Sequence, residues 1–375
     1  MYNQSGLTKL YIDKSAIVHN LSQIKSIVKA DTEIVPVIKA NGYGSDSCAI
    51  AKILDENGIN MFAVANTIEA VKLRKAGINQ NILLLYQPSF KEIDNITDYN
   101  LTSSVCDLKF IENLNENAKQ KNKLVKVHVE IDTGMGRLGI KPEDSLIFFK
   151  TIMEFDHIET EGIFMHYASA DSIGIAEMEY SKKQTKIFNS VVKELKKNGI
   201  GIKYKHASSS GAIFNYPEAE YNMVRPGFIL YGYYPNECFK KIINLKPSFK
   251  LVSEIIFIKE VPEGTNIGYG STFITKRKSK IAAVAIGYSG GLKRSLSNKG
   301  YICVKNKKAP IAGRVNMDIT MIDITDIPDA KVGDEAAVFD NELITIEDIA
   351  EICDTIGYEI ISTISDSVKR EFISF

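Results

Sequence analysis

A lysine that directly follows an apolar run is the residue in this sequence best suited to covalent chemistry. Lys39 comes after the run IVPVI and precedes the segment NGYG. Burial at the end of a strand lowers the pKa of a lysine amine and leaves it nucleophilic enough to form a Schiff base with a carbonyl compound. A surface lysine at a strand end gives the same local pattern more simply, so other residues must decide between these interpretations.

Further polar residues lie at or just beyond the ends of apolar runs, namely Asn66, Tyr86, Arg137, His166, Ser209, Ser210 and Arg225. The eight runs cover residues 34–40, 61–66, 82–86, 102–106, 125–133, 158–168, 204–210 and 224–232. Segments with apolar residues at helical spacing separate them. Eight strands with intervening helices predict a (β/α)8 barrel, whose site residues converge at the carboxyl ends of the strands. Each polar residue alone could be a solvated loop residue, and the expected convergence is what favours a site.

From about residue 245 the pattern changes to β-branched runs interrupted by glycine and proline. Such runs are typical of an all-β unit. We therefore expect an α/β protein with two domains. The barrel is predicted over residues 10–240, and a mostly-β domain over 241–375, joined by an N-terminal strand at 1–9.

Composition excludes several classes of function. Lysine plus arginine and aspartate plus glutamate both number 46, so no excess charge favours binding to nucleic acid or to an anionic membrane. The five cysteines are scattered, which indicates neither a metal site nor a disulfide framework. No apolar stretch has the form of a signal peptide or a membrane span. We expect a cytoplasmic enzyme that acts on a small molecule.

Eight motifs together resemble those of the alanine racemase family. They are VIKANGYG around Lys39, VEIDTGMGRLG (129–139), GIFMHYASAD (162–171), NMVRPGFILYG (222–232), IGYGSTF (267–273), AIGYSGG (285–291), PIAGRVNMD (310–318) and TIGYE (355–359). They occur in the order of the family and span nearly the whole chain. The resemblance implies a fold-type III, pyridoxal-phosphate-dependent amino acid racemase.

The resemblance assigns the two bases of racemisation. Lys39 would carry the cofactor and serve the D-enantiomer, and Tyr269 would serve the L-enantiomer on the opposite face. Two bases are needed because one lysine cannot reach both faces of the substrate without a large movement. His166 and Arg225 resemble the family residues that stabilise the tyrosine phenolate with neighbouring charge.

The other implied roles concern binding. Arg225 would face the pyridine nitrogen and, because an arginine stays protonated, weaken the cofactor as an electron sink. Arg137 would approach the cofactor and the substrate carboxylate, which the backbone N–H of Met317 would also bind. The phosphate-binding set would comprise Tyr43, Ser209, Ser210, Gly227, Phe228 and Tyr358. Tyr288 and Asp318 would line the entrance.

In the family, the β domain reaches the barrel of the other subunit, which implies a head-to-tail homodimer. Several positions depart from the family pattern. Glu130 stands where some members have a carbamylated lysine, and Ser289 to Gly291 lack the acid that the family has after Tyr288. The other departures are Ser45 and Asp46 after Tyr43, Asn316 before Met317, and a C-terminal segment in which Arg370 is the clearly retained arginine. Glu130 keeps a negative group near Arg137. The other changes leave the two bases in place and open the question of substrate.

Several functions stay open on the sequence. The leading prediction is interconversion of L-alanine and D-alanine for cell-wall synthesis. A serine or broad-specificity racemase is the nearest alternative, because the pocket for the substrate side chain is small and a few entrance residues determine which side chains it accepts. Related decarboxylases would carry an acid at the position of Arg225, and a lone-barrel cofactor-binding protein would lack the β domain with Tyr269. A non-catalytic, pyridoxal-phosphate-binding paralogue is the remaining alternative.

Overall fold

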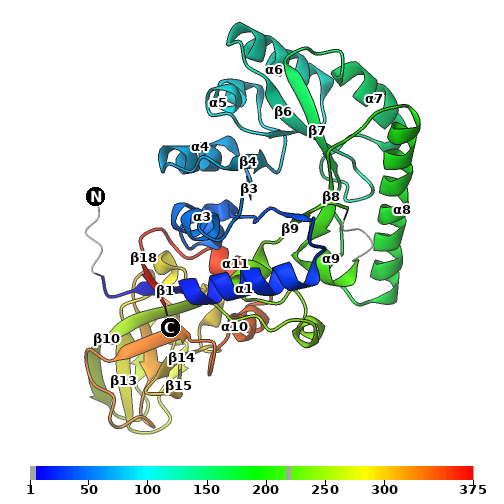
Figure 1. Cartoon of the computed structure of the whole chain (residues 1–375). Helices are drawn as coiled ribbons and strands as arrows, with labels where there is room; N and C mark the ends of the chain where they lie inside the picture. The colour runs from blue at the N-terminus through cyan, green and yellow to red at the C-terminus, as the bar shows by residue number, and fades with distance from the viewer. Residues whose placement is uncertain (1–5, 217–220, 375) are drawn as a thin grey trace. The chain divides into compact units, whose positions relative to one another are not determined.

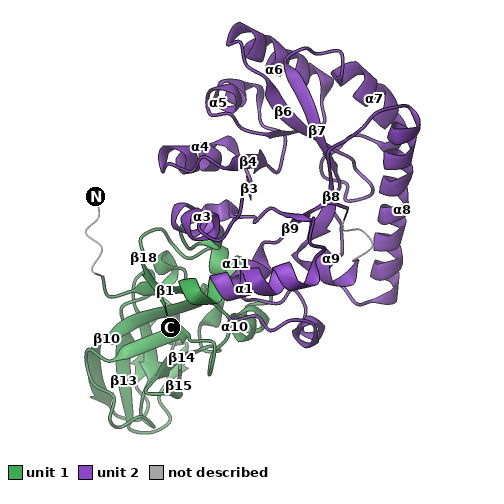
Figure 2. Cartoon of the chain, in the orientation of Figure 1, with its two compact units in different colours: residues 1–17, 43–46, 247–375 green, residues 18–42, 47–246 purple. Residues whose placement is uncertain are grey.

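The computed structural model describes residues 6–216 and 221–374. The chain divides into two compact units (Figure 2). Residues 18–42 and 47–246 form a barrel unit, and the remaining described residues form a β-rich unit. Residues 1–5 of the strand expected over 1–9 lie outside the described part of the chain.

Eight parallel strands build the barrel unit (Figure 1): β2 (Glu33–Ile34), β3 (Met61–Val64), β4 (Asn81–Leu84), β5 (Ser103–Val105), β6 (Val125–Glu130), β7 (Ile158–Phe164), β8 (Tyr204–Ser209) and β9 (Met223–Arg225). Six of them pair in the order β2-β9-β8-β7-β6-β5, and β3 pairs with β4. Single parallel bridges, Val37 with Ala63 and Leu83 with Thr102, connect the two sheets at both edges. The strands therefore close into a barrel, which confirms the predicted fold.

Helices follow the strands and surround them (Figure 1): α1 (Lys14–Ile27), α2 (Lys39–Tyr43), α3 (Ser47–Asp55), α4 (Thr67–Lys75), α5 (Ile93–Asp98), α6 (Leu108–Gln120), α7 (Ser145–Ile152), α8 (Ile175–Lys197) and α9 (Ser210–Asn215). In β6 three valines alternate with Lys126, His128 and Glu130. Because successive side chains of a strand point to opposite faces, the valines face the helices and the polar residues face the barrel interior. There His128 contacts His206 of β8.

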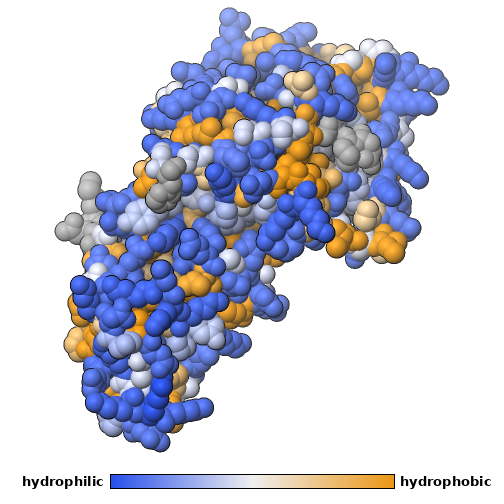
Figure 3. Space-filling model, turned by 60° about the horizontal axis from the view of Figure 1, so that its bottom comes forward, coloured by the Kyte–Doolittle hydropathy of each residue, from blue (hydrophilic) through white to orange (hydrophobic). Residues whose placement is uncertain are grey.

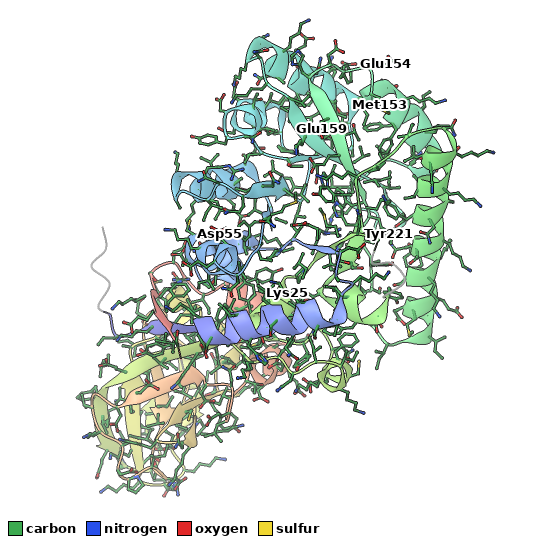
Figure 4. The ribbon with its side chains drawn as sticks, viewed as in Figure 1. Lys25, Asp55, Met153, Glu154, Glu159 and Tyr221 are labelled. Atoms are coloured by element: carbon green, nitrogen blue, oxygen red, sulfur yellow. The ribbon has the colours of Figure 1, made fainter. Side chains whose placement is uncertain are left out.

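The residues labelled in Figure 4 mark the end of the barrel where strands begin. Lys25 lies near the end of α1, Asp55 ends α3, Glu159 lies near the start of β7, and Tyr221 precedes β9. In a barrel of parallel strands, helix ends and strand starts meet at one end. The predicted site residues of the barrel unit follow the opposite ends of the strands.

Two predicted strands are shorter than their apolar runs. In the run 34–40 the regular strand β2 ends at Ile34, since Pro36 has no N–H to donate to the ladder. Single backbone hydrogen bonds from Val35, Val37 and Ile38 still join the run to both neighbouring strand regions. The run 224–232 ends as a strand at Arg225, and Pro226 precedes a 3-10 helix over Phe228–Tyr231. In both cases a site residue therefore lies in a turn or directly before one.

The β-rich unit is organised by its longest strand, β10 (Phe249–Val261), which pairs with β1, β13 and β17. The other elements are β1 (Lys9–Asp13), β11 (Asn266–Ile267), β12 (Phe273–Ile274), β13 (Ser279–Val284), β14 (Tyr301–Val304), β15 (Lys307–Pro310), β16 (Thr320–Asp323), β17 (Glu335–Phe339), α10 (Ile346–Ile352), α11 (Gly357–Ser362) and β18 (Lys369–Ile373). Thr345 caps α10 in a capping box with Asp348. The mostly-β character expected beyond residue 245 is confirmed, and the unit also contains the two helices α10 and α11.

Hydrophilic residues predominate on the face shown in Figure 3, where hydrophobic side chains form several separate spots. In the part of the chain that the structure describes, no helix has both the length and the apolar character that crossing a membrane requires.

Gly44 approaches the backbone of the β-rich unit more closely than a larger residue could. Its φ is +84°, and a Cβ built on it would overlap the carbonyl oxygen of Ile361 in α11. Arg370 of β18 donates from Nη2 to the Gly44 carbonyl at 2.7 Å and from Nε to the Ser45 carbonyl at 3.1 Å. These contacts fasten residues 43–46 to the β-rich unit.

Gly44→Ala should therefore destabilise the protein by about 3 kcal/mol, since it adds a steric overlap to the cost of a left-handed residue. Gly58→Ala is a matched control, because Gly58 has a φ of +82° but nothing within 4 Å of the position that a Cβ would take. The control should cost only about 1 kcal/mol. Thermal unfolding followed by circular dichroism measures both variants, and equal losses would contradict the importance of the Ile361 contact.

Candidate active site

Lys39 lies where the first strand region of the barrel ends, directly after Ile38, whose N–H donates to the Ala63 carbonyl at 2.9 Å. The Lys39 side chain reaches solvent, yet its pKa is lowered, first by desolvation and then by the charges of Arg137 and Arg225. Glu69 acts in the opposite direction and raises this pKa. The result is an amine more nucleophilic than an ordinary surface lysine.

The backbone directly after Lys39 adopts a left-handed turn. Ala40, Asn41 and Gly42 have φ values of 51°, 53° and 67°, and Tyr43 has a φ of 56°. Left-handed conformations cost about 1–2 kcal/mol for each residue other than glycine. Strain of this kind persists only where surrounding contacts impose it, and it is concentrated at functional sites.

Arg225, at the end of β9, is held inside the barrel by hydrogen bonds. It is only 3% exposed. Nη1 bonds to Nδ1 of His206, and Nη2 donates to the Met165 carbonyl at 3.0 Å and to the Ala207 carbonyl at 3.3 Å. Burial lowers the pKa of Arg225 to about 10, so the guanidinium is still protonated at neutral pH.

A chain of two buried histidines continues from Arg225. Because an arginine only donates, His206 must accept at Nδ1 and carry its own proton on Nε2, which bonds to Nδ1 of His128 at 2.8 Å. Desolvation and the charge of Arg225 lower the pKa of His206 well below its ordinary value and that of His128 to about 3. Both rings are therefore neutral, with fixed tautomers.

His166 follows β7 and lies beside Arg225, with 3.5 Å between its Nδ1 and Nη2 of the arginine. Desolvation lowers the pKa of His166 to about 3, and the charges of Arg225, Arg137 and Lys39 act in the same direction. His166 is thus a neutral imidazole in a positively charged environment, able to accept a hydrogen bond or donate one.

Arg137 lies in the glycine-rich turn after β6. Asp132 fixes this turn, since its Oδ1 accepts the N–H groups of Gly134 at 2.9 Å and Gly136 at 3.0 Å. The Arg137 side chain is exposed, and within the described residues no hydrogen bond or ion pair engages its guanidinium. The geometry leaves Arg137 available for an anionic ligand.

Glu130 is buried at the end of β6, 5% exposed. Desolvation raises its pKa to about 7, although the charges of Arg225 and Arg137 act to lower it. It forms no ion pair with Arg137 among the described residues. Glu130 therefore influences Arg137 through its field rather than through direct contact, and this charge is partial near neutral pH.

Two of the predicted phosphate-binding segments meet inside the barrel unit. Ser210, the first residue of α9, accepts the N–H of Gly227 on its hydroxyl at 3.0 Å. Gly227 directly precedes the 3-10 helix that begins at Phe228, and Ser209 precedes α9 without a side-chain cap bond. The starts of α9 and of the 3-10 helix over Phe228–Tyr231 are thus adjacent.

In the β-rich unit, the rings of Tyr43 and Tyr358 lie 6.3 Å apart between centroids. Burial raises the pKa of Tyr43 above its ordinary range, so it is a neutral hydrogen-bonding group. Tyr269 is 70% exposed in a turn between two glycines with positive φ. The guanidinium of Arg314 packs against Gly270 of that turn.

Tyr288, Met317 and Asp318 come together in the same unit. The Tyr288 N–H donates to the Asn316 carbonyl at 3.0 Å, and the Ser289 N–H donates to the Met317 carbonyl at 2.9 Å. The Ser289 hydroxyl donates to Oδ1 of Asp318 at 2.7 Å. Within the described residues no acceptor takes the N–H of Met317.

The predicted residues thus fall into separate clusters. Charge interactions link Lys39, Arg137, His166 and Arg225 in the barrel unit. A hydrogen bond links Ser210 to Gly227, and a ring contact links Tyr43 to Tyr358. Tyr269 is exposed apart from these clusters. Five residues that contact or influence these clusters were missed: Glu69, Lys72, His128, His206 and Arg314. The two histidines carry a signal in hindsight, because each occupies an inward position of a barrel strand. No metal-binding group of three or more histidine, cysteine or acidic residues occurs within the described ranges.

A closed barrel with a desolvated lysine beside two arginines, joined to a β-rich unit, defines a two-domain barrel enzyme. The family described as "Alanine racemase, N-terminal domain" matches residues 12–235, and "Alanine racemase, C-terminal domain" matches residues 248–372. The chain belongs to the alanine racemase family, as the motifs predicted.

Relatives match over nearly their full length. Alanine racemase 2 of Caldanaerobacter subterraneus subsp. tengcongensis is 41% identical, over 100% of this chain and 96% of the relative. The alanine racemase of Methanococcus maripaludis is 41% identical, over 96% and 97%. Among solved structures, alanine racemase of Clostridium difficile 630 has a TM-score of 0.95 at 35% identity, covering 99% of this chain and 96% of that one. Alanine racemase from Bacillus anthracis with bound L-Ala-P has a TM-score of 0.91 at 33% identity, covering 98% and 95%.

Glu130→Gln should stabilise the protein at alkaline pH. The folded pKa of Glu130, about 7, lies above its ordinary value of 4.5, so its neutral form stabilises the fold and this contribution is lost as pH rises through 7. Glutamine cannot ionise, and the variant should be more stable by about 2 kcal/mol at pH 9 and nearly equal at pH 5. Unfolding midpoints across this range measure the difference, with exposed Glu112→Gln as control. A difference that does not change with pH would contradict the assignment.

Proposed function

We propose that this chain interconverts L-alanine and D-alanine, with pyridoxal phosphate as cofactor and with Lys39 and Tyr269 as the two bases. The observation that carries the proposal is the desolvated amine of Lys39 beside Arg137 and Arg225, in a chain of the alanine racemase family. A nucleophilic amine suits the aldehyde of the cofactor, and two arginines suit anionic and ring-nitrogen acceptors.

The donors of the barrel unit fit pyridoxal phosphate. We propose that the Ser209 and Ser210 hydroxyls bind the phosphate together with the backbone of Gly227 and Phe228, the Gly227 N–H exchanging its present bond to the Ser210 hydroxyl for one to the phosphate. Arg137 has a guanidinium without a partner among the described residues. We add Tyr43 and Tyr358 to the phosphate-binding set. When bound, the cofactor withdraws electrons from the substrate α-carbon and so makes its proton acidic.

The protein's own groups then govern where protons and charges lie. Lys39 Nζ exchanges the α-proton on one face, which its lowered pKa favours. Arg225, held by His206 and the Met165 carbonyl, is proposed to donate to the ring nitrogen and stays protonated while doing so. His166, neutral and next to Arg225, is proposed to bond to the phenolic group of Tyr269 from the other subunit of a homodimer.

A head-to-tail homodimer accounts for the unengaged groups of the β-rich unit. Tyr269 is 70% exposed and Met317 is 55% exposed. The Met317 N–H, which no described residue accepts, is proposed to bind the substrate carboxylate of the partner. We propose that the β domain, over 241–375 with 1–9, completes the site of the other subunit's barrel domain, over 10–240, with Tyr288 and Asp318 at the entrance. As the family resemblance implies, the enzyme would act in the cytoplasm and supply D-alanine for the cell wall.

A serine or broader racemase is a second candidate. The observation in its favour is at the proposed entrance, where Ser289 stands in a segment without the family's acid and donates its hydroxyl to Asp318. A changed entrance alters which side chains are admitted, whereas the two bases do not depend on it.

Exchange of the α-proton in deuterium oxide tests the function directly. Purified protein with pyridoxal phosphate should exchange and invert L-alanine faster than L-serine, L-lysine or L-ornithine, as measured by NMR and chiral chromatography. Lys39→Ala should lose both this activity and the visible absorbance of bound cofactor, because no amine remains to bind the aldehyde. Faster turnover of serine would favour the second candidate, and retained cofactor absorbance in the variant would overturn the role of Lys39.

Tyr269→Ala should keep the cofactor absorbance but lose racemisation by at least about a hundredfold, since general base catalysis contributes on the order of 10²–10⁴. Exchange of the D-alanine α-proton without inversion should persist, because Lys39 still serves that face. Tyr301→Ala, another exposed tyrosine of the β-rich unit, is the control. Normal turnover of L-alanine by the Tyr269 variant would disprove the two-base proposal.

A further inference from the structure

We infer that Glu69 and Lys72, two residues of α4, are positioning residues that hold the backbone turn carrying Lys39. The inference rests on the proposed function of Lys39. It concerns the three residues after Lys39, whose left-handed conformation the chain does not adopt without help. Both residues contact this turn from a helix that follows the next strand of the barrel.

Glu69 connects the turn to the adjacent strand. Its Oε1 accepts the N–H of Ala40 at 2.6 Å, and its Oε2 accepts the N–H of Ala65 at 2.8 Å. Ala40 directly follows Lys39, and Ala65 directly follows β3. One carboxylate therefore fixes the ends of two neighbouring strand regions, which requires two acceptor oxygens. Asn66, the N-cap of α4, accepts the N–H of Glu69 at 2.9 Å and so fixes Glu69 itself.

Lys72 holds the next residue of the turn. Its Nζ donates to Oδ1 of Asn41 at 2.7 Å, and the same oxygen accepts the N–H of Ser47 at 3.2 Å. Glu69 and Lys72 are three residues apart on α4, so their side chains leave the same face of the helix. The turn is thus held at two successive residues by one helical face, and α4 determines where Lys39 points.

Glu69 also acts on Lys39 through its charge. The groups that influence the Lys39 amine are Arg137 and Arg225, which lower its pKa with desolvation, and Glu69, which raises it. Glu69 therefore keeps the amine basic enough to accept a proton in an otherwise positive site. Lys72 contacts the turn without a comparable effect on the amine. Variants of the two residues can therefore distinguish an effect on the position of Lys39 from an effect on its basicity.

The experiment compares four variants of the holoenzyme. Glu69→Gln removes the charge and one acceptor, Glu69→Asp keeps the charge but is too short to reach both amides, and Lys72→Met removes only the Asn41 contact. Lys75→Met is the matched control, since Lys75 is an exposed lysine of the same helix. Visible absorbance verifies bound cofactor, thermal unfolding reports stability, and kcat and KM are measured across pH for D-alanine and for L-alanine.

Three results are expected. Glu69→Gln should lower kcat by about ten- to a hundredfold, as for a small misplacement of a reacting group, with KM changed less than about threefold. In this variant the acid limb of the pH profile of kcat should move to lower pH for D-alanine, because Lys39 takes the α-proton of that enantiomer and loses the charge that raises its pKa. For L-alanine the acid limb should stay in place. Glu69→Asp and Lys72→Met should lower kcat without moving either limb, and Lys75→Met should match the wild type.

The inference would be overturned if Glu69→Gln and Lys72→Met left kcat and KM unchanged. A loss of thermal stability without a change in kinetics would overturn it too, because it would show that these contacts only hold α4 in place. If Glu69→Gln does not fold, Glu69→Asp and Lys72→Met decide by the same criteria. A wild-type protein that neither binds pyridoxal phosphate nor racemises alanine would refute the proposed function, and the inference with it. Normal wild-type activity with unaltered variants would refute the inference alone.

Discussion

The buried positive charge of Arg225 is the constraint on which the interior of the barrel depends. Desolvation lowers the pKa of Lys39, His128, His166 and His206, and the charge of Arg225 acts in the same direction on each of them. A buried charge of this kind is tolerated only when its hydrogen bonds are satisfied. The carbonyls of Met165 and Ala207 and the ring of His206 meet this condition, and Phe164 lies under the guanidinium, 5.4 Å from its carbon to the ring centroid. The neutral histidines and the weakly basic lysine follow from desolvation together with this charge.

A second constraint is the path of the chain around Lys39. The segment leaves the barrel unit after Gly42, joins the β-rich unit at Tyr43, and returns at Ser47. Arg370 and the close approach of Gly44 to Ile361 fix its far end. The left-handed turn therefore lies between two anchored regions, which explains why a strained conformation persists there.

Much of the fold and part of the site could be predicted from local patterns. Eight apolar runs separated by helical periodicities require parallel strands with crossover helices, and a closed barrel buries them all. The β-branched runs beyond residue 245 predicted the second unit in the same way. Because polar residues at strand ends converge at one mouth, Lys39, Arg137, His166 and Arg225 were expected to lie near one another, and charge interactions do link them. Their roles at a site stay predictions. The prolines at 36 and 226 shortened the strands that carry two of them.

The sequence by itself determined the architecture and the family, since these depend on spacing and residue type along the chain, and the resemblance to that family predicts that Lys39 is the reactive lysine. Only the tertiary structure decided which distant groups meet. His128 and His206 are 78 residues apart, and Glu69 is 29 residues from Ala40, whose N–H it accepts. Strand register and helix docking bring such pairs together, and no local periodicity records them. The pKa of Lys39 and of Glu130 likewise depends on desolvation and surrounding charge, which exist only once the chain has folded.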